Sequence, residues 1–218
     1  MVSFPLRLSR TLSLIGVLAA LICALAIAAS LPGASGRSAA TSAKSLLPDP
    51  SVDEPLAARP GGETMVVAGG CFWGVQAVFA SVRGVVSSTS GYAGGTKQTA
   101  DYETVSTGRT GHAESVRVIF DPSKISYGQL LRVFFSVAHD PTQLNQQGPD
   151  VGTQYRSAIF YHSPEQKKAA EDTIARLTAE HRFPKPIVTQ VVPADTFWRA
   201  EEYHQKYLEK RGMVSCHI

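Results

Sequence analysis

The sequence predicts an α/β (α+β) fold in which one domain, residues 63–218, is built on a split βαβ core. Three observations lead to this fold class. The chain has 218 residues, and its length favours one domain over two. Its hydrophobic fraction of 44% is typical of a globular protein. After residue 63, strand and helix patterns follow in the order β-α-β-β-α-β, which is typical of ferredoxin-like folds. Added helices and long loops are expected around this core.

The first four elements of the domain are short and are separated by glycine. The β-branched and apolar run 64–68 predicts a buried strand that ends at two glycines. Apolar residues then recur at helical spacing, which predicts a helix over 71–82. A strand is expected at 85–90, followed by a glycine-rich loop. Alternating apolar and polar residues predict the next strand at 115–120, with one apolar face.

The second half of the domain adds three helices and two strands. Ser126 can cap a helix that carries two pairs of apolar residues. The run 156–161 predicts a strand. The residues Ser-Pro-Glu-Gln at the start of 163–181 predict a capping box and a helix. A strand over 187–192 and a last short helix over 201–210, stopped by a glycine, complete the order.

The amino-terminal segment 1–31 has the pattern of an export signal or of an amino-terminal membrane anchor. Two arginines precede the long apolar run 12–31, and alanine pairs that suit cleavage lie near its end. The run is also nearly long enough to span a bilayer, so an uncleaved segment would attach the chain to a membrane. Cys23 is interpreted as an apolar residue of this segment. We therefore expect an exported domain, periplasmic or membrane-anchored and facing outside the cytoplasm.

The composition of residues 32–62 predicts a linker between this segment and the domain. The net charge of the chain bears on nucleic-acid partners. Residues 32–62 are rich in Ala, Ser, Pro and Gly and lack a sustained apolar period, which is typical of a flexible tether. The net charge of the chain is +3, and export would lower it by two. This balance gives no support to a nucleic-acid partner. The domain is expected to be a monomer.

A cysteine at the start of the first predicted helix carries the clearest chemical signal. Cys71 follows a strand and two glycines. The backbone amides of a first helical turn and the helix dipole favour a thiolate, the nucleophilic form of cysteine. Phe72 lies on the apolar period, whereas Trp73 lies off it and is expected to line a pocket. The alternative is that Cys71 is a small buried apolar residue, as many cysteines are.

The residues around Cys71, GCFWG at 70–74, resemble the signature of the A-type peptide methionine sulfoxide reductases. The resemblance covers essentially all of 63–218. It continues through the blocks 91–95, 102–103, 111–114, 139–143, 147–157 and 200–208. It implies an α/β core of ferredoxin-like type. It also implies an oxidoreductase that reduces peptide-bound and free methionine S-sulfoxide to methionine, and so repairs oxidised proteins.

The resemblance also implies roles for individual residues. Cys71 aligns with the nucleophile that attacks the sulfoxide sulfur, and Glu114 aligns with the acid that protonates the sulfoxide oxygen. Tyr102 and Tyr155 align with phenols that donate hydrogen bonds to that oxygen. A sulfoxide sulfur is a poor electrophile until its oxygen is protonated or hydrogen-bonded. A buried carboxyl that stays neutral near pH 7 can supply this proton.

Further positions complete the site that the resemblance implies. Phe72 and Trp73 align with the pocket for the substrate methyl group, and Asp150 aligns with an aspartate of the site. No bound cofactor and no metal are expected. The His-Ala-Glu sequence at 112–114 is similar to part of a zinc deaminase motif, but no P-C-x-x-C follows it.

The nucleophile must be reduced again after each turnover. Attack leaves Cys71 as a sulfenic acid, which condenses with a nearby thiol. Cys216 is the other cysteine of the exported domain, and it is the third residue from the end. It is therefore the expected resolving cysteine. The family often has two cysteines in a longer tail, so a second relay disulfide is not expected here. A thioredoxin or thioredoxin-like protein would then reduce the disulfide.

Two other functional classes remain open from the sequence. One is a different thiol enzyme, a peroxidase or a disulfide oxidoreductase that uses Cys71 and Cys216. The absence of a C-x-x-C motif argues against the second of these. The other class is a membrane-tethered binding module in which the two cysteines form a permanent structural disulfide. Such a module would contain no thiol that iodoacetamide labels rapidly near neutral pH.

Overall fold

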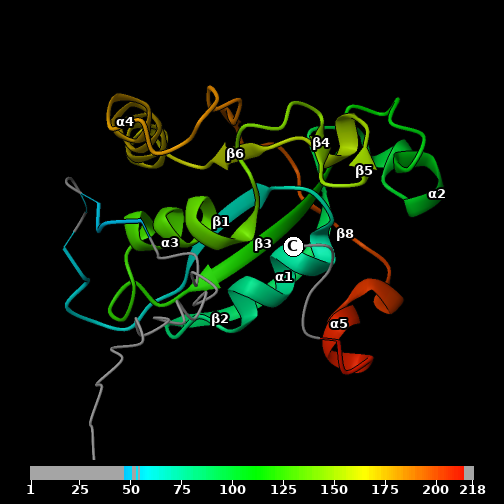
Figure 1. The fold of residues 1–218 in the computed structure, drawn as a ribbon. Helices are drawn as coiled ribbons and strands as arrows, with labels where there is room; N and C mark the ends of the chain where they lie inside the picture. Colours follow the sequence, from blue (N-terminus) through cyan, green and yellow to red (C-terminus); the bar gives the residue numbers. More distant parts are fainter. Residues whose placement is uncertain (1–46, 51–52, 54, 214–218) are drawn as a thin grey trace, which may run out of the picture. The chain divides into compact units, whose positions relative to one another are not determined.

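A central sheet of six strands organises the domain (Figure 1). The computed structural model describes residues 47–50, 53 and 55–213. The strand order across the sheet is β7-β6-β1-β3-β2-β8. These strands are β1 (Glu63–Ala68), β2 (Val85–Ala93), β3 (Ala113–Phe120), β6 (Ala158–Tyr161), β7 (Gln190–Pro193) and β8 (Trp198–Arg199). A separate hairpin pairs β4 (Gln146–Gln147) with β5 (Asp150–Val151).

In the described part of the chain, five α-helices and several single turns lie between these strands or follow the last of them. The α-helices are α1 (Phe72–Ala80), α2 (Tyr102–Val105), α3 (Tyr127–Val133), α4 (Pro164–Ala179) and α5 (Tyr207–Lys210). Short 3₁₀ turns cover Lys97–Thr99, Thr153–Tyr155 and Glu202–His204, and a π-helical turn, Phe134–Ala138, extends α3.

The four inner strands form the split βαβ core and confirm the fold class expected from the sequence. β1 pairs antiparallel with β3 and with β6, and β2 pairs antiparallel with β3. α1 leads from β1 to β2, and α3 leads from β3 toward β6. α4 then leads from β6 to β7, and these two strands pair in parallel. A parallel pair needs a crossover of this kind, which α4 supplies.

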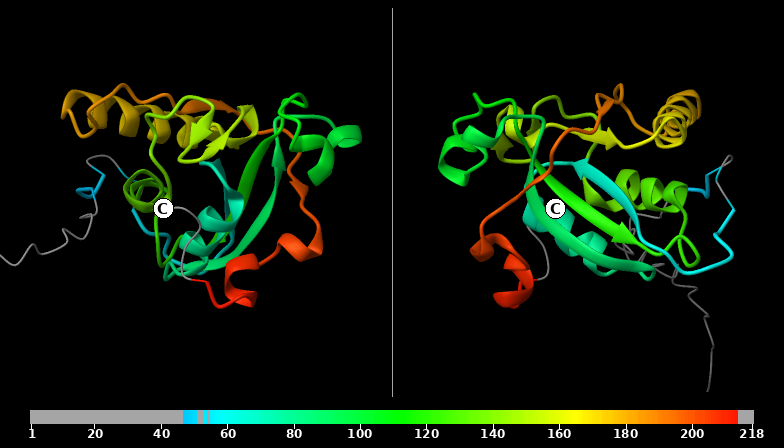
Figure 2. Two further views of the ribbon diagram at one scale, coloured as in Figure 1. Left: turned by 45° about the vertical axis from the view of Figure 1, so that its right-hand side comes forward. Right: turned by 180° about the vertical axis from the view of Figure 1, so that it is seen from behind.

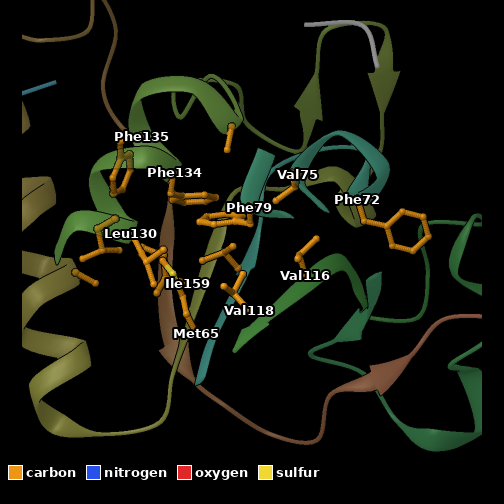
Figure 3. Close-up of a cluster of buried hydrophobic side chains, with 14 of the residues drawn as sticks. Met65, Phe72, Val75, Phe79, Val116, Val118, Leu130, Phe134, Phe135 and Ile159 are labelled. Carbon is orange, nitrogen blue, oxygen red and sulfur yellow. The ribbon is translucent and has the colours of Figure 1, made fainter. Parts of the chain in front are cut away.

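The main hydrophobic core lies between the sheet and the helices α1 and α3 (Figures 1 and 3). The predicted alternation of β3 places Val116 and Val118 on this face, where both are fully buried. Phe79 of α1 and Phe134 after α3 meet there above Met65 of β1 (Figure 3). Burial of each large side chain stabilises the fold by roughly 2 kcal/mol. The core therefore fixes α1, and with it the position of Cys71, against β3.

The opposite face of the sheet is covered by the chain that joins β7 to β8. This connection crosses the back of the sheet from one edge strand to the other (Figure 2, right). Its Phe197 packs against a second apolar cluster that includes Val66, Ala68 and Phe160. The guanidinium of Arg117 lies 5.0 Å from the centre of the Phe197 ring. The crossing brings β8 to the edge of the sheet beside β2.

Two serines begin helices as expected from the sequence. The Ser126 hydroxyl accepts from the Gln129 amide, and the Gln129 side chain accepts from the Ser126 amide, which completes a capping box. The Ser163 hydroxyl accepts from the Gln166 amide in the same way. The Gln166 side chain, however, accepts from the amide of His162 and not from that of Ser163. In this second capping box, the return hydrogen bond therefore comes from the amide one residue before Ser163.

β2 extends three residues beyond its predicted end, through Gly91 to Ala93. The glycine permits this because β8 pairs against the strand at that point. A Cβ on Gly91 would lie 2.3 Å from the carbonyl oxygen of Trp198 and 2.3 Å from the ring of Phe197. The predicted loop therefore begins only after Ala93, because long-range pairing extends the strand.

The helix predicted over 201–210 is wrong, because Lys206 divides this segment into two short pieces. Lys206 has a φ of 53°, in the left-handed region. Its amide donates to Gln76 Oε1 of α1, at 2.8 Å. The buried Gln205 side chain donates to the carbonyls of Ser90 and Ala200. These contacts to α1 and β2 replace the hydrogen bonds of a continuous helix.

The segment before β1 contacts α3 where it is described. Asp53 accepts hydrogen bonds from the Ser126 hydroxyl and the Gly128 amide. Arg132 binds the carboxylate of Asp49 and the carbonyl of Leu47. These residues belong to the stretch interpreted as a linker. The predictions for residues 1–31, for Cys23 and for Cys216 lie outside the described residues. Within the described part of the chain, no helix has the length and apolar character needed to cross a membrane.

Candidate active site

A small cavity of about 110 Å³ lies at the start of α1. Its lining contains seven of the eight candidate residues from the sequence: Cys71, Phe72, Trp73, Tyr102, Glu114, Asp150 and Tyr155. The eighth, Cys216, lies outside the described residues. Two larger pockets, of about 470 and 480 Å³, lie elsewhere and contain none of these residues. The small cavity is therefore where the sulfur, carboxyl and phenol groups meet.

Cys71 caps α1, and two glycines bring the chain to it. Its backbone carbonyl accepts from the amides of Gly74 and Val75, while its side chain makes no capping hydrogen bond. Gly70 has a φ of 87°, a conformation that side chains disfavour. A Cβ on Gly70 would lie 2.6 Å from the Gln147 side chain of β4. This close approach places the β4–β5 hairpin, with Asp150, beside the thiol.

Glu114 supplies a buried carboxyl directly under the start of α1. It is the second residue of β3, on the same face as Val116, and only 3% of its surface is exposed. The amide of Phe72 donates to Glu114 Oε2 at 3.0 Å. Burial raises the pKa of Glu114 to about 8, the Phe72 amide opposes this rise, and the charge of Asp150 adds to it. The carboxyl is therefore largely protonated near pH 7 and can donate a proton into the cavity.

Tyr102 and Tyr155 bring two phenols to the same cavity. Tyr102 is the first residue of α2, and Tyr155 is the last of its 3₁₀ turn. Burial, followed by the charge of Glu114, raises the pKa of both phenols. Both therefore remain protonated and act as hydrogen-bond donors at neutral pH.

The segment 106–112 links the parts of the chain that carry Tyr102, Glu114 and Tyr155. The Thr153 hydroxyl donates to the carbonyl of Gly108, and the Gln154 side chain donates to the carbonyl of Ser106. The guanidinium of Arg156 donates to the carbonyls of Gly111 and His112. The turn that carries Tyr155 is thus tied to the connection between α2 and β3. As a result, Tyr102, Glu114 and Tyr155 are held in fixed positions relative to one another.

Trp73 forms one wall of the cavity and is held by residues near the end of the chain. Its indole stacks on the Tyr207 ring, with 3.7 Å between ring centres and 6° between planes. Its Nε1–H donates to Nδ1 of His204 at 3.0 Å. His204 is only 1% exposed. Sequence reasoning missed His204 and Tyr207 because contact with Trp73 depends on the break at Lys206.

The histidines next to the cavity have structural partners. His112 Nε2 lies 3.0 Å from the carbonyl oxygen of Thr96. His139 Nε2 lies 2.7 Å from the Ser157 hydroxyl, and its Nδ1 lies 3.2 Å from the Phe134 carbonyl. Across residues 47–50, 53 and 55–213, no three His, Cys, Asp or Glu side chains are grouped in a way that could hold a metal ion.

Comparisons with known proteins agree on one family. The sequence model described as "Peptide methionine sulfoxide reductase" matches residues 63–218. A relative from Acidobacterium capsulatum, named peptide methionine sulfoxide reductase MsrA, is 63% identical over 149 residues, covering 68% of this chain and 95% of the relative. A relative of the same name from Geobacter sulfurreducens is 56% identical over 154 residues, covering 71% and 94%.

Solved structures show the same fold. Reduced Mxr1 from Saccharomyces cerevisiae is similar with a TM-score of 0.65 and 32% identity, covering 74% of this chain and 96% of that one. Methionine sulfoxide reductase A of Corynebacterium diphtheriae is similar with a TM-score of 0.61 and 35% identity, covering 78% and 85%.

Proposed function

The chain belongs to the peptide methionine sulfoxide reductase family, a family of oxidoreductases, and from this premise we propose its reaction and the role of each residue. The protein reduces the S epimer of methionine sulfoxide to methionine, both in peptides and as the free amino acid. Its substrates are proteins and peptides that contain oxidised methionine, and its role is their repair. The site contributes only protein groups to this reaction.

In the first step, the thiolate of Cys71 attacks the sulfoxide sulfur. Glu114 gives a proton to the sulfoxide oxygen, and Tyr102 and Tyr155 donate hydrogen bonds to it. The attack forms a bond between the two sulfur atoms. The protonated oxygen then moves to the Cys71 sulfur, which breaks both the sulfur–oxygen bond of the substrate and the bond between the two sulfurs. Methionine leaves, and Cys71 becomes a sulfenic acid, so the substrate gains the two electrons that Cys71 loses. Phe72 and Trp73 enclose the substrate methyl group, and Asp150 lines the same cavity.

The observation that carries this proposal is the buried carboxyl of Glu114 in the same cavity as Cys71. An ordinary glutamate has a pKa of 4.5 and would be ionised at neutral pH, whereas the pKa of Glu114 is raised to about 8. A proton held at neutral pH beside a nucleophilic sulfur suits a substrate whose oxygen must be protonated before the sulfur is attacked.

In the second step, the thiol of Cys216 attacks the sulfenic acid. A disulfide forms between Cys71 and Cys216, and water leaves. A thioredoxin or thioredoxin-like dithiol then reduces this disulfide and is itself oxidised. The support for this step is chemical, because the cycle requires a second thiol and Cys216 is the other cysteine between residues 63 and 218.

The test uses separate S and R epimers of a methionine sulfoxide peptide with dithiothreitol as reductant. We expect fast loss of the S epimer alone. We also expect Cys71→Ser to abolish this loss and Glu114→Gln to slow the first step while the protein stays folded. Hydrogen peroxide serves as a competing substrate. If the protein turns over peroxide faster than the S epimer, it is a thiol peroxidase and the proposal is wrong.

We further propose that the domain works outside the cytoplasm. The support is the basic and apolar pattern of residues 1–31, followed by the Ala-, Ser-, Pro- and Gly-rich stretch 32–62. Cell fractionation and amino-terminal sequencing of the protein from its host test this proposal and separate cleavage from anchoring. Recovery of the full-length protein in the cytoplasmic fraction would contradict it.

A further inference from the structure

The carboxylate of Glu201 does not line the cavity, but it lies against Tyr102, which does, and against Tyr92 and His204, whose rings pack on the lining residue Phe72. It follows β8 and comes just before the 3₁₀ turn Glu202–His204. Its Oε1 accepts from the amide of Tyr102 at 3.0 Å. Its Oε2 accepts from the Tyr92 phenol at 2.8 Å and lies 3.8 Å from His204 Nε2. Tyr92 is fully buried and pairs across the sheet with Glu114, so this anchor is rigid.

The hydrogen bond from Trp73 fixes where the proton of His204 must be. An indole N–H is only a donor, so Nδ1 of His204 must accept and the ring proton must be on Nε2. Nε2 is buried and makes no hydrogen bond to the described residues. Glu201 Oε2 lies near it, and a negative charge at this distance favours the proton on Nε2. The carboxylate therefore keeps Nδ1 available to Trp73.

The contact with Tyr102 controls the second wall of the cavity. α2 has only four residues and cannot hold its conformation alone. Two carboxylates satisfy amides at its start: Asp101 accepts from Thr104, and Glu201 accepts from Tyr102. The direction in which the Tyr102 phenol enters the cavity therefore depends on Glu201.

Glu201 carries a negative charge at neutral pH. Burial by itself would raise its pKa. The amides of Glu201 and Tyr102 and the Tyr92 phenol outweigh this effect, with a smaller contribution from His204, and hold the pKa below its usual range. The carboxylate therefore accepts from Tyr92 and Tyr102 across the neutral range.

We propose that Glu201 is a positioning residue that sets two walls of the cavity through two separate contacts. One contact acts on Trp73 through the tautomer of His204, and the other acts on Tyr102 through its backbone amide. This inference rests on the proposed function, because sulfoxide reduction is the reaction in which the two walls have different roles. Trp73 acts in substrate binding, whereas the Tyr102 phenol acts on the oxygen during the reaction.

Two substitutions separate the two contacts. Glu201→Gln keeps an oxygen for the Tyr102 amide, but its NH₂ group can donate to His204 Nε2 and so favours the tautomer that cannot accept from Trp73. We expect KM for the S-sulfoxide peptide to rise about three- to tenfold with little change in kcat, the effect of one lost hydrogen bond. Glu201→Leu removes both contacts, so kcat should fall as well.

Glu202→Gln is the matched control. Its carboxylate is exposed, pairs with Arg199 and Lys210, and does not contact the cavity. We expect both KM and kcat to stay as in the wild type. A rise in KM in this variant equal to that in Glu201→Gln would show a general effect of lost charge and would overturn the proposal.

Nitrogen-15 NMR of the protein, purified in the form that its host produces, gives a readout independent of activity. In the wild type we expect the His204 proton on Nε2 and a hydrogen-bonded indole N–H for Trp73, which Trp198→Phe distinguishes from the second tryptophan. In Glu201→Gln the indole signal should move toward that of an exposed indole. A wild-type proton on Nδ1, or an unchanged indole signal in Glu201→Gln, would overturn the proposal even if Glu201→Leu fails to fold. Inactivity of the wild type on both epimers would instead contradict the proposed function, and the NMR would still decide on Glu201.

Discussion

Replacing Glu114 with glutamine should remove a loss of folding stability that the wild-type protein undergoes at alkaline pH. In the folded state burial raises the pKa of Glu114 from 4.5 to about 8. The folded protein therefore binds this proton more tightly than the unfolded chain does. The contribution of Glu114 to stability is fully present below the unfolded pKa of 4.5 and is lost as the pH rises to about 8. Glutamine has no such titration.

The size of the effect follows from the two pKa values. A tenfold difference in proton affinity corresponds to about 1.4 kcal/mol, so the interval between 4.5 and about 8 corresponds to a loss on the order of 5 kcal/mol. We expect the difference in unfolding free energy, Glu114→Gln minus wild type, to grow by several kcal/mol between pH 5 and pH 9. All other titrating groups are common to both proteins and cancel in this difference.

Urea unfolding with dithiothreitol present, at several pH values between 5 and 9, measures this difference. Glu103→Gln serves as the control, because Glu103 is exposed on α2. Its replacement should leave the pH dependence of the unfolding free energy unchanged. If the stability curves of the wild type and Glu114→Gln run parallel over this range, Glu114 is not a buried acid with a raised pKa. The proton-donor role would then have no basis.

Three further outcomes are expected. Gly70→Ala should destabilise the protein by about 1–2 kcal/mol, because φ is positive there, and should lower kcat/KM by displacing Gln147 and its hairpin; denaturant unfolding and steady-state rates measure the two effects. Cys216→Ser should still form one methionine per protein and then stop as a sulfenic acid, seen by mass spectrometry as a dimedone adduct; continued turnover with a thioredoxin donor would contradict the resolving role. Asp53→Ala should lower the unfolding free energy by about 0.5–2 kcal/mol, since Asp53 accepts from Ser126 and Gly128 at the start of α3, whereas Asp49→Ala, at an exposed ion pair, should change it by less than about 1 kcal/mol in the same denaturation experiment.

The features that the sequence predicts well depend on local patterns. The position of Cys71 at the start of α1 follows from a strand, two glycines and a helical period. The alternation along β3 puts Val116 and Val118 in the core. β3 begins two residues before its predicted start, and this extension puts Glu114 on the same helix side of the sheet.

The features that the sequence does not predict depend on contacts between distant segments. α2 is a helix of four residues, and the amide of its first residue, Tyr102, is satisfied by Glu201, 99 positions later in the chain. His204 is buried because Lys206 adopts a left-handed conformation and bonds to Gln76. The π-helical turn after α3 and the β4–β5 hairpin have no periodic pattern to indicate them.

The hydrogen bond from the Phe72 amide to Glu114 has a consequence for partly unfolded molecules. The amide belongs to the residue next to Cys71, so fraying of the first turn of α1 displaces the thiol and releases the carboxyl in the same event. When this turn opens, Cys71 is no longer positioned as the nucleophile and Glu114 is no longer positioned as the acid. Loss of activity under mild denaturation should therefore follow amide hydrogen exchange at Phe72 as one transition.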